Sequence, residues 1–422
     1  MAEARSYLNS HTEHYDLIQV SLIDTWATTA AGGLTLSENK LYTTEAWVDF
    51  LSRLNNDGIL TFSRWYTPGH HPQEFYRLLA IGSAAVRAYD VAANPRNHLL
   101  AASVNRVATV IVSKSPITPR EVEHFKKICA DHNFKPLLTP DYAVDEVAGI
   151  ISSGKADAAY YNAQPYDISP STDDRPFFFN NLRLSSFLSA KGFMGWGNFA
   201  VQLMLYLTIF TLVVVVVCIA LPLLRIYREQ RLRFMGAPPY IAYFALIGIG
   251  FMLVEIAQMQ HLMIFLGHPI YGLCVVLFTL LLASSFGSYL QDGLAPTSRN
   301  IWLYPLLVCI VLVVVGMVMP WVAQQAKYYD TPARIAISVA MLIPMGMAMG
   351  AMFPVGVALA QRKYEGLLPW YWGINGVGSV FASVFAVLLS LQFGISLTFW
   401  AGVACYLLCL LIILCLRVES NT

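Results

Sequence analysis

The stretch FAVQLMLYLTIFTLVVVVVCIALPL, residues 199–223, decides the class of this protein. It carries no charged side chain, and it exceeds the roughly 20 apolar residues that a helix needs to cross a bilayer. Further apolar runs follow at residues 238–262, 268–290, 301–322, 333–360, 371–393 and 395–416. We therefore predict an all-α polytopic membrane domain of about seven spans over residues 186–422.

The composition of the chain agrees with a membrane protein and excludes several other classes. Of the 422 residues, 56% are hydrophobic and 13% are charged, whereas a soluble domain carries about 25% charged residues. A single soluble domain and a disordered chain are therefore both excluded. The net charge of +1 provides no basic face, so we expect no nucleic-acid partner. The cysteines lack the paired spacing of disulfides or a zinc site, and no metal is predicted.

Residues 1–185 differ from the rest because predicted strands alternate with predicted helices. The strands lie at residues 15–22, 58–65 and 108–114, and the helices begin near Thr43, Pro72 and Thr118. This alternation is typical of a parallel sheet with helices on both faces. We predict a partial Rossmann-like, methyltransferase-type α/β domain, which would bind its ligand at the carboxyl ends of its strands.

The loop after the first predicted strand is the best candidate for a ligand site. It runs from Ile23 to Gly33 and holds Asp24, which could meet a substrate amine or could serve only as a turn residue. A nucleotide site also needs a glycine-rich first turn, and no such turn precedes Tyr15. We therefore expect either a chain that begins within the domain or a domain that does not bind a nucleotide alone. In the first case an upstream segment or a partner chain would complete the sheet.

Several motifs resemble those of bacterial spermidine synthases that are fused to membrane helices. The soluble motifs are YDLIQVSLIDTW (15–26), ENKLYTTEAWVDFLSRLNNDGILTFSRW (38–65) and STDDRPFFF (171–179). The membrane motifs are GFMLVEIAQMQ (250–260) and FLGHPIYGLCVVLF (265–278). The resemblance implies a protein related to aminopropyl transfer from decarboxylated S-adenosylmethionine to a polyamine. Because the glycine-rich cofactor loop is lacking, it implies common ancestry, and catalysis by this chain alone is not expected.

The resemblance also implies roles for individual residues. In the family, one Asp directly follows the matched strand and accepts a proton from the attacking amine, and a second Asp lies three residues later. Ser21 and Asp24 occupy these catalytic positions here, and a serine is a poor base for an ammonium nucleophile. Tyr42 matches the family's Leu-Tyr-Thr motif and becomes a candidate substrate-binding residue.

Asp173 and Asp174 form the sharpest polar cluster ahead of the membrane domain. Two adjacent carboxylates could bind a cationic substrate such as a polyamine. They could equally cap the segment and pair with Arg175. Both readings of these two candidate substrate-binding residues remain open at this point.

The membrane domain contains one conspicuous charge, because Glu255 is the only formally charged residue between Arg233 and Asp292. A lone carboxylate within a span is costly and by default marks a functional site or a buried partner. Gln258 and His261 lie about 60° and 120° round the helix from Glu255. His268 and Tyr271 begin the next span. Such a group could relay protons or bind a cation, or a neutral Glu255 could hydrogen-bond a neighbour and hold two helices in register.

Small residues are dense at 344–351 and at 373–379, a run that includes Asn375. They could allow tight helix packing, or they could interrupt helices and form a substrate site at the midplane of a transporter. The elements around Glu255, Gly350–Pro354 and Asn375 resemble a membrane module of the same family. The alternative function is therefore a transporter or sensor for a small, polyamine-like cation, using Glu255, Gln258, His261, His268 and Asn375.

The orientation of the chain in the membrane is left open. Arg225, Arg228, Arg231 and Arg233 crowd one link between spans, and the positive-inside rule places that link in the cytoplasm. Alternation then puts the soluble region outside, although its implied cofactor is cytoplasmic. We predict an integral protein of the bacterial inner membrane whose soluble domain could lie on either side.

Overall fold

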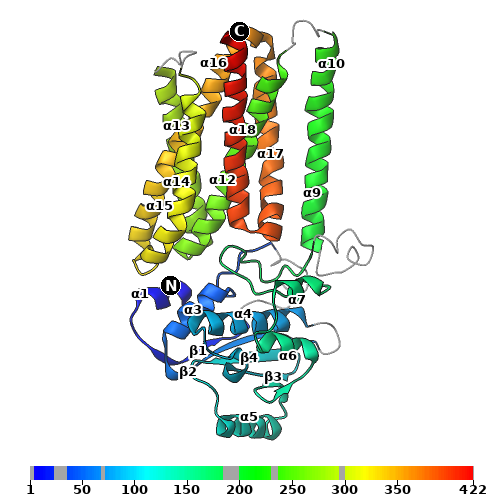
Figure 1. Ribbon diagram of the computed structural model, residues 1–422, viewed down its shortest axis with the longest axis vertical. Coiled ribbons are helices and arrows are strands. Elements are labelled where there is room, and N and C mark those ends of the chain that lie inside the picture. The colour runs from blue at the N-terminus through cyan, green and yellow to red at the C-terminus, as the bar shows by residue number, and fades with distance from the viewer. Residues whose placement is uncertain are drawn as a thin grey trace. The chain divides into compact units, whose positions relative to one another are not determined.

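The computed structural model describes residues 4–22, 36–67, 72–183, 199–229, 236–293 and 300–421. The chain forms two compact units, Met1–Gln202 and Leu203–Thr422. The first is built on a β-sheet and the second is entirely helical (Figure 1). The predicted domain boundary at residues 185/186 lies outside the described residues.

A mixed sheet of six strands forms the centre of the first unit. In spatial order its strands are β1 (Tyr15–Val20), β2 (Leu54–Trp65), β4 (Val107–Ser113), β3 (Leu99–Val104), β5 (Lys135–Thr139) and β6 (Tyr142–Ala143). Only the pair β1 and β2 is parallel, and every other neighbouring pair described is antiparallel. The prediction of a parallel sheet is therefore wrong beyond its first pair of strands.

A hairpin that the sequence pattern did not reveal reverses the strand direction. Strand β3 joins β4 through Asn105 and Arg106, which both have positive φ angles (46° and 67°). Two-residue hairpin turns need positive φ at both central positions, and Asn-Gly is their usual signature. Because Arg106 replaces the glycine, the turn signal is weak. The hairpin places β4 antiparallel between β2 and β3.

Six α-helices in the described part of the first unit pack around its sheet. They are α1 (Ala4–Ser10), α3 (Thr44–Ser52), α4 (Gln73–Tyr89), α5 (Pro119–Asp131), α6 (Glu146–Ser152) and α7 (Ala158–Ala163). Trp47 of α3 stacks on Phe62 of β2 with ring centroids 4.5 Å apart. Strand β1 lies at one end of the sheet, and its Leu17 is 50% exposed. This end of the sheet is thus less covered than its centre.

Seven helices of the second unit's described part are long and apolar enough to cross a membrane. This finding confirms the predicted number of spans and indicates an integral membrane protein. Two of these spans consist of consecutive segments. The helices are α9 (Phe199–Val215), continued by a π-helical turn (Val216–Ala220) and α10 (Leu221–Glu229), then α12 (Pro238–Leu266), α13 (Pro269–Gly293), α14 (Leu303–Ala326), α15 (Thr331–Gly350), α16 (Met352–Tyr364), α17 (Leu368–Phe393) and α18 (Ile395–Asn421).

Helix α12 is the central helix of this unit and contacts α13, α15, α16, α17 and α18. Its approach to α17 is very close, since a Cβ atom built on Gly248 would lie 2.4 Å from the carbonyl oxygen of Asn375. A Cβ atom on Gly402 of α18 would lie 2.7 Å from the Val254 side chain. Small residues therefore allow these helices to pack closely, as expected in lipid.

The small-residue run 344–351 packs closely against a neighbouring helix and also ends at a helix interruption. Its Gly346 and Gly350 face α13 at close range. The same run ends in an interruption at Ala351, between α15 and α16. The hydroxyl group of Tyr243 on α12 donates to the carbonyl oxygen of Met352 at 2.8 Å, which satisfies a backbone group at this interruption.

Candidate functional site

A buried polar pair of the membrane unit lies on α12. The side chain of Glu255 is 6% exposed and that of Gln258 is 1% exposed. The two residues are one helical turn apart and lie well inside a helix that spans Pro238–Leu266. Among the described residues, none forms a hydrogen bond or an ion pair with the Glu255 carboxyl group. The oxygen Oε1 of Gln258 likewise has no donor within the described structure.

Such an arrangement is energetically expensive. Placing an ionised acidic side chain at the centre of a membrane helix costs at least about 2.5–3.5 kcal/mol. Leaving a buried amide oxygen without a donor costs about 1–3 kcal/mol more. The pair therefore requires a proton or a cation, which makes it a stronger candidate for a site than any other polar group described in the membrane unit.

Helical periodicity shows which face of α12 carries the pair. Glu255 follows Phe244 by 255 − 244 = 11 residues, about three turns, so both side chains lie on nearly the same face. Phe244 packs against Phe353 of α16, with ring centroids 5.3 Å apart, and stacks on Tyr371 of α17 at 4.8 Å. At the level of Phe244, this face of α12 is turned toward α16 and α17.

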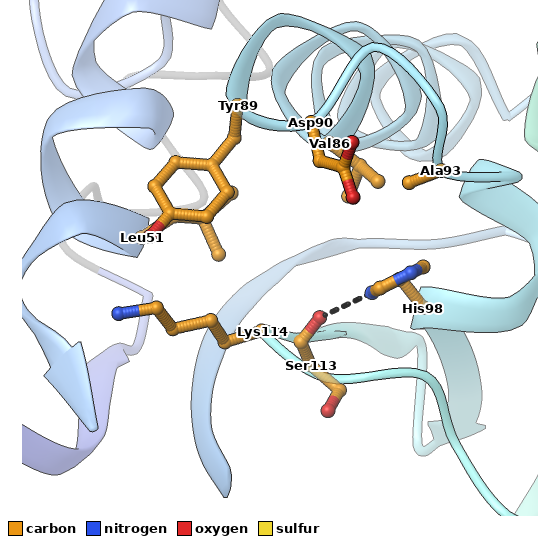
Figure 2. Close-up of a pocket in the computed structure, with 8 residues that line it drawn as sticks. All are labelled: Leu51, Val86, Tyr89, Asp90, Ala93, His98, Ser113 and Lys114. Carbon is orange, nitrogen blue, oxygen red and sulfur yellow. Dashed lines mark hydrogen bonds between the residues drawn. The ribbon is translucent and has the colours of Figure 1, made fainter. Parts of the chain in front are cut away.

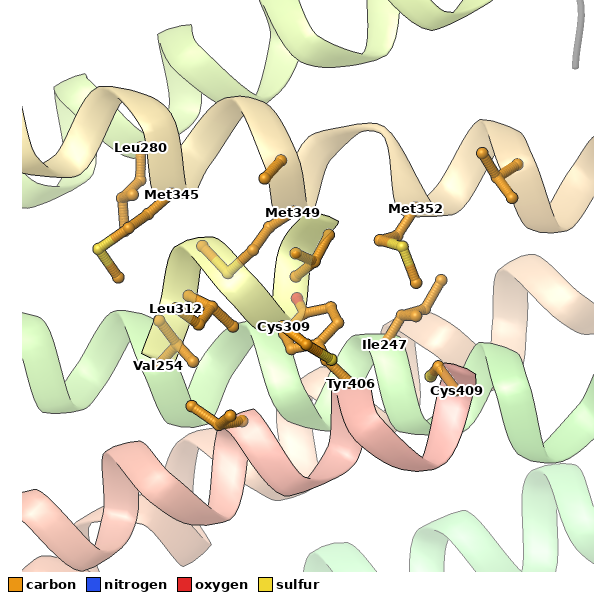
Figure 3. Packing of buried hydrophobic residues seen from close by; sticks show 14 of the residues in the cluster. Ile247, Val254, Leu280, Cys309, Leu312, Met345, Met349, Met352, Tyr406 and Cys409 are labelled. Carbon is orange, nitrogen blue, oxygen red and sulfur yellow. The ribbon is translucent and has the colours of Figure 1, made fainter. Parts of the chain in front are cut away.

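An apolar core adjoins the pair. Figure 3 shows Val254 of α12 in one apolar cluster with Leu312 of α14, Met345 and Met349 of α15, and Tyr406 of α18. Tyr406 interacts electrostatically with Glu255. The surroundings therefore supply little polarity to stabilise a charge on the carboxylate.

Two other predicted membrane residues, His268 and Asn375, contact backbone groups outside this pair. His268 is exposed, and its Nδ1 lies 3.3 Å from the backbone N–H of Ile270 at the beginning of α13. The Nδ2 group of Asn375 donates to the carbonyl oxygen of Phe244 at 3.1 Å and joins α17 to α12. His261 is partly buried. Of the predicted intramembrane group, only Glu255 and Gln258 are buried.

In the α/β unit, the structure describes only one of the two predicted catalytic residues. Ser21 lies exposed just after β1, and Asp24 lies outside the described residues. Tyr42 is fully buried and stacks on Phe178, with ring centroids 4.5 Å apart. Its hydroxyl oxygen accepts a hydrogen bond from Nη1 of Arg64 at 3.3 Å. Tyr42 is therefore a core residue in this structure, and the role predicted for it as a substrate ligand stays untested.

Asp173 is engaged by a cation of the chain itself. Two nitrogens of Arg5 donate to its two carboxylate oxygens at 2.8 Å each, and Thr43 donates to it at 2.7 Å. Nε of Arg5 also donates to Asp49 at 2.9 Å. Burial by itself would lower the pKa of Arg5, but the two carboxylates outweigh burial and raise it. The contacts favour a structural role for Asp173.

Arg175 forms an ion pair with Asp167. Asp174 is partly buried and makes polar or electrostatic contacts of its own. The backbone turns between Thr172 and Arg175, and Asp173 meets Arg5 whereas Arg175 meets Asp167.

Arg77 of α4 organises the segment that contains these residues, and sequence reasoning missed it. Its side chain is 3% exposed. Nε donates to the carbonyl oxygen of Ser169 at 3.0 Å. Nη1 donates to further carbonyl oxygens, those of Phe177 (3.1 Å), Phe178 (2.6 Å) and Asn180 (2.7 Å). Burial lowers the pKa of Arg77 to about 10 against the opposing charge of Asp167, so the side chain is still cationic at neutral pH.

Acidification is expected to weaken the α/β unit through Asp167. Burial by itself would raise the pKa of Asp167, but Arg77 and Arg175 outweigh it and lower the pKa from 3.8 to about 2. A depressed acid pKa contributes stability that is present above the unfolded pKa, and that is lost as the pH falls from about 5 to about 2. The contribution is about 2 kcal/mol.

This expectation is checked by unfolding the full chain over that pH range, with proteolysis of the α/β unit as the readout. The Asp167→Asn variant should be less stable at neutral pH and should lose less stability on acidification. The exposed Asp131→Asn serves as the control. Parallel pH profiles for Asp167→Asn and the unmodified chain would contradict the assignment.

A small hollow in the α/β unit does not resemble a ligand site. Its volume of about 10 Å³ suits one water molecule. Figure 2 shows Lys114, His98 and Asp90 at its wall. Lys114 donates to the carbonyl oxygen of Leu54 at the beginning of β2. The hollow thus lies at the amino end of the parallel pair, opposite the edge at which open α/β sheets bind ligands.

No family model, curated protein or solved structure matches this chain. The functional interpretation therefore rests on the geometry of the two units. Of the positions described above, Glu255 and Gln258 are deeply buried, and among the described residues the carboxyl group has no ion-pair partner and the amide oxygen has no donor. The polar groups of the α/β unit described above are mostly neutralised by partners within the unit.

Proposed function

We propose that this chain is an integral protein of the bacterial inner membrane that carries a small cation through its helical unit by way of Glu255. The observation that carries the proposal is the burial of this carboxyl group, 6% exposed, without an ion-pair partner among the described residues. Intramembrane carboxylates of this kind commonly mark ion pathways and proton relays.

Two further features support a transport role. Helix α12, which bears Glu255, contacts five other helices of the unit, so a change at this residue can reach most of the described bundle. The span formed by α15 and α16 is interrupted at Ala351. Interrupted helices near the middle of the membrane are frequent at the substrate sites of transporters.

The proposal predicts that Glu255→Gln abolishes cation transport. The full chain, reconstituted into lipid vesicles, should take up radiolabelled spermidine or should move protons, which a trapped pH-sensitive dye detects. Glu255→Gln keeps the size of the side chain and removes its charge, so the rate should fall to that of empty vesicles. Ser285→Ala, an exposed position on α13, should transport normally. Unchanged transport in Glu255→Gln would overturn the proposal.

A second candidate function is aminopropyl transfer from decarboxylated S-adenosylmethionine to a polyamine, as in the spermidine synthases that the sequence resembles. The supporting observation is the unit β1–α3–β2, in which two parallel strands are joined through a helix. Ser21 follows the carboxyl end of β1, where an open α/β sheet binds its ligand. In-line positioning of amine and donor would supply most of the catalysis.

The second candidate is tested by equilibrium binding of decarboxylated S-adenosylmethionine to the full chain in detergent. Micromolar binding would support the enzymatic function, with or without an upstream segment or partner chain that completes the sheet. Absence of binding at millimolar ligand, on folded protein, would exclude catalysis by this chain alone. Glu255→Gln should leave this binding unchanged and so separates the two candidates.

A further inference from the structure

We infer that the ligand of the membrane site is a proton, held on the Glu255 carboxyl group and donated to Oε1 of Gln258. The inference rests on the proposed function and specifies the cation involved. It starts from two unsatisfied polar groups on one turn of α12. The carboxylate carries a charge that no described residue neutralises, and the amide oxygen lacks a donor.

One proton on the Glu255 carboxyl group would satisfy both polar groups. A protonated carboxyl group is neutral, which abolishes most of the cost of burial. It also gains one O–H donor, and residues three apart on a helix are close enough for their side chains to interact. The O–H group of Glu255 can therefore donate to Oε1 of Gln258. Neither side chain needs a partner from another helix.

Larger cations fit the donor set less well. A calcium ion takes six to eight oxygen ligands, and magnesium needs near-octahedral coordination. In the described part of the chain, no group of three or more His, Cys, Asp or Glu side chains could hold a metal ion. A primary ammonium group brings three N–H donors, whereas the residues flanking the pair, Val254 and Ala257, belong to the apolar core.

Among the described residues, no titratable or charged group on the neighbouring elements forms an ion pair with Glu255. Arg334 of α15 donates to the carbonyl oxygen of Phe265, which lies 265 − 255 = 10 residues or about 15 Å along α12 from Glu255. Tyr406 of α18 interacts with Glu255 and is neutral at physiological pH. Further titratable side chains are described on α12, α13, α14, α17 and α18. They are tyrosines, cysteines and one histidine: Tyr240, Tyr243, His261, Tyr271, Cys274, Tyr289, Tyr304, Cys309, Tyr371, Cys405, Cys409 and Cys415.

Infrared spectroscopy of the full chain in lipid vesicles tests this inference. At about pH 8, where exposed carboxyl groups are ionised, the spectrum should contain the C=O stretch of a protonated carboxyl group. The band should shift in D₂O and should be absent in Glu255→Gln. In Gln258→Leu the band should remain but move to higher frequency, because its hydrogen-bond acceptor is gone.

Gln260→Leu is the matched control, since Gln260 is also buried on α12 but lies about 140° round the helix from Glu255. This variant should leave the band in place. Absence of a Glu255-dependent band, or a band that Gln258→Leu does not move, would overturn the inference. If the chain transports a cation through Glu255 but shows no such band, the proposed function stands and the inference that the ligand is a proton is wrong. If the band is present but no cation is transported, the proton is held as inferred and the proposed transport function is wrong.

Discussion

Replacing Arg77 with methionine is expected to destabilise the α/β unit by about 3–5 kcal/mol, as the loss of one partner from a buried ion pair does. Asp167 would lose a cation whose Nη2 lies 3.4 Å away. The carbonyl groups of Ser169, Phe177, Phe178 and Asn180 would lose their buried donor, and each unsatisfied group adds a further penalty. Methionine preserves the apolar stem, so the effect isolates the guanidinium group.

Hydrogen exchange of the full chain in detergent measures this effect. Amides of residues 169–181 and of α4 should exchange faster in Arg77→Met, while the helices of the membrane unit should exchange at unchanged rates. Arg87→Met is the matched control on the same helix, because Arg87 is exposed and makes one hydrogen bond, to the carbonyl oxygen of Gly154. Similar exchange in the two variants would show that the buried contacts contribute little.

Replacing Gly287 with alanine is expected to separate α13 from α15 and to cost the membrane unit about 3 kcal/mol. A Cβ atom at this position would lie 2.0 Å from the carbonyl oxygen of Met347. The facing surface is equally tight, because a Cβ atom on Gly350 would lie 2.1 Å from the carbonyl oxygen of Ser284. These neighbours are backbone atoms, which cannot move aside as a flexible side chain can.

Thermal unfolding of the full chain in detergent, followed by the loss of monodisperse protein, checks this expectation. Gly376→Ala on α17 provides the control, since a Cβ atom there meets no atom within 4 Å. That variant should be neutral or more stable by up to about 1 kcal/mol, because alanine favours helix more than glycine does. Equal stability of Gly287→Ala and Gly376→Ala would refute the close packing of α13 and α15.

The membrane helices were predictable because the thickness of a bilayer dictates the length of each apolar run. The predicted span 371–393 corresponds to Leu368–Phe393, and the predicted span 395–416 corresponds to Ile395–Leu416. Their packing partners depend on contacts between distant residues, such as Gly248 with Asn375. Composition indicated that small residues would lie at helix contacts, but not which helices would meet.

The sheet was predictable only in part. Hydrophobic patterning located β1, β2 and β4, and strand direction depends on the connections between them. The run Leu99–Val104 follows a helix closely and lacks a strong turn signal at Asn105, so β3 and its hairpin were missed.

The candidate site was partly visible in the sequence because a lone acidic residue among apolar neighbours is chemically conspicuous. Periodicity also placed Gln258 near Glu255. It also put His261 on the same broad face. His268 was added because it begins the next span, and it lies exposed at a helix start. Arg77 escaped notice because an arginine in an amphipathic helix ordinarily points to solvent, and only the path of residues 169–180 makes it a buried donor.

The segment that Arg77 holds is fixed by a second arginine at the end of its described residues. Arg183 is held in turn by Asn162, whose side-chain oxygen accepts from Nη1 at 3.1 Å. Arginine side chains thus satisfy carbonyl groups in this segment that a helix or strand would otherwise pair through its own backbone.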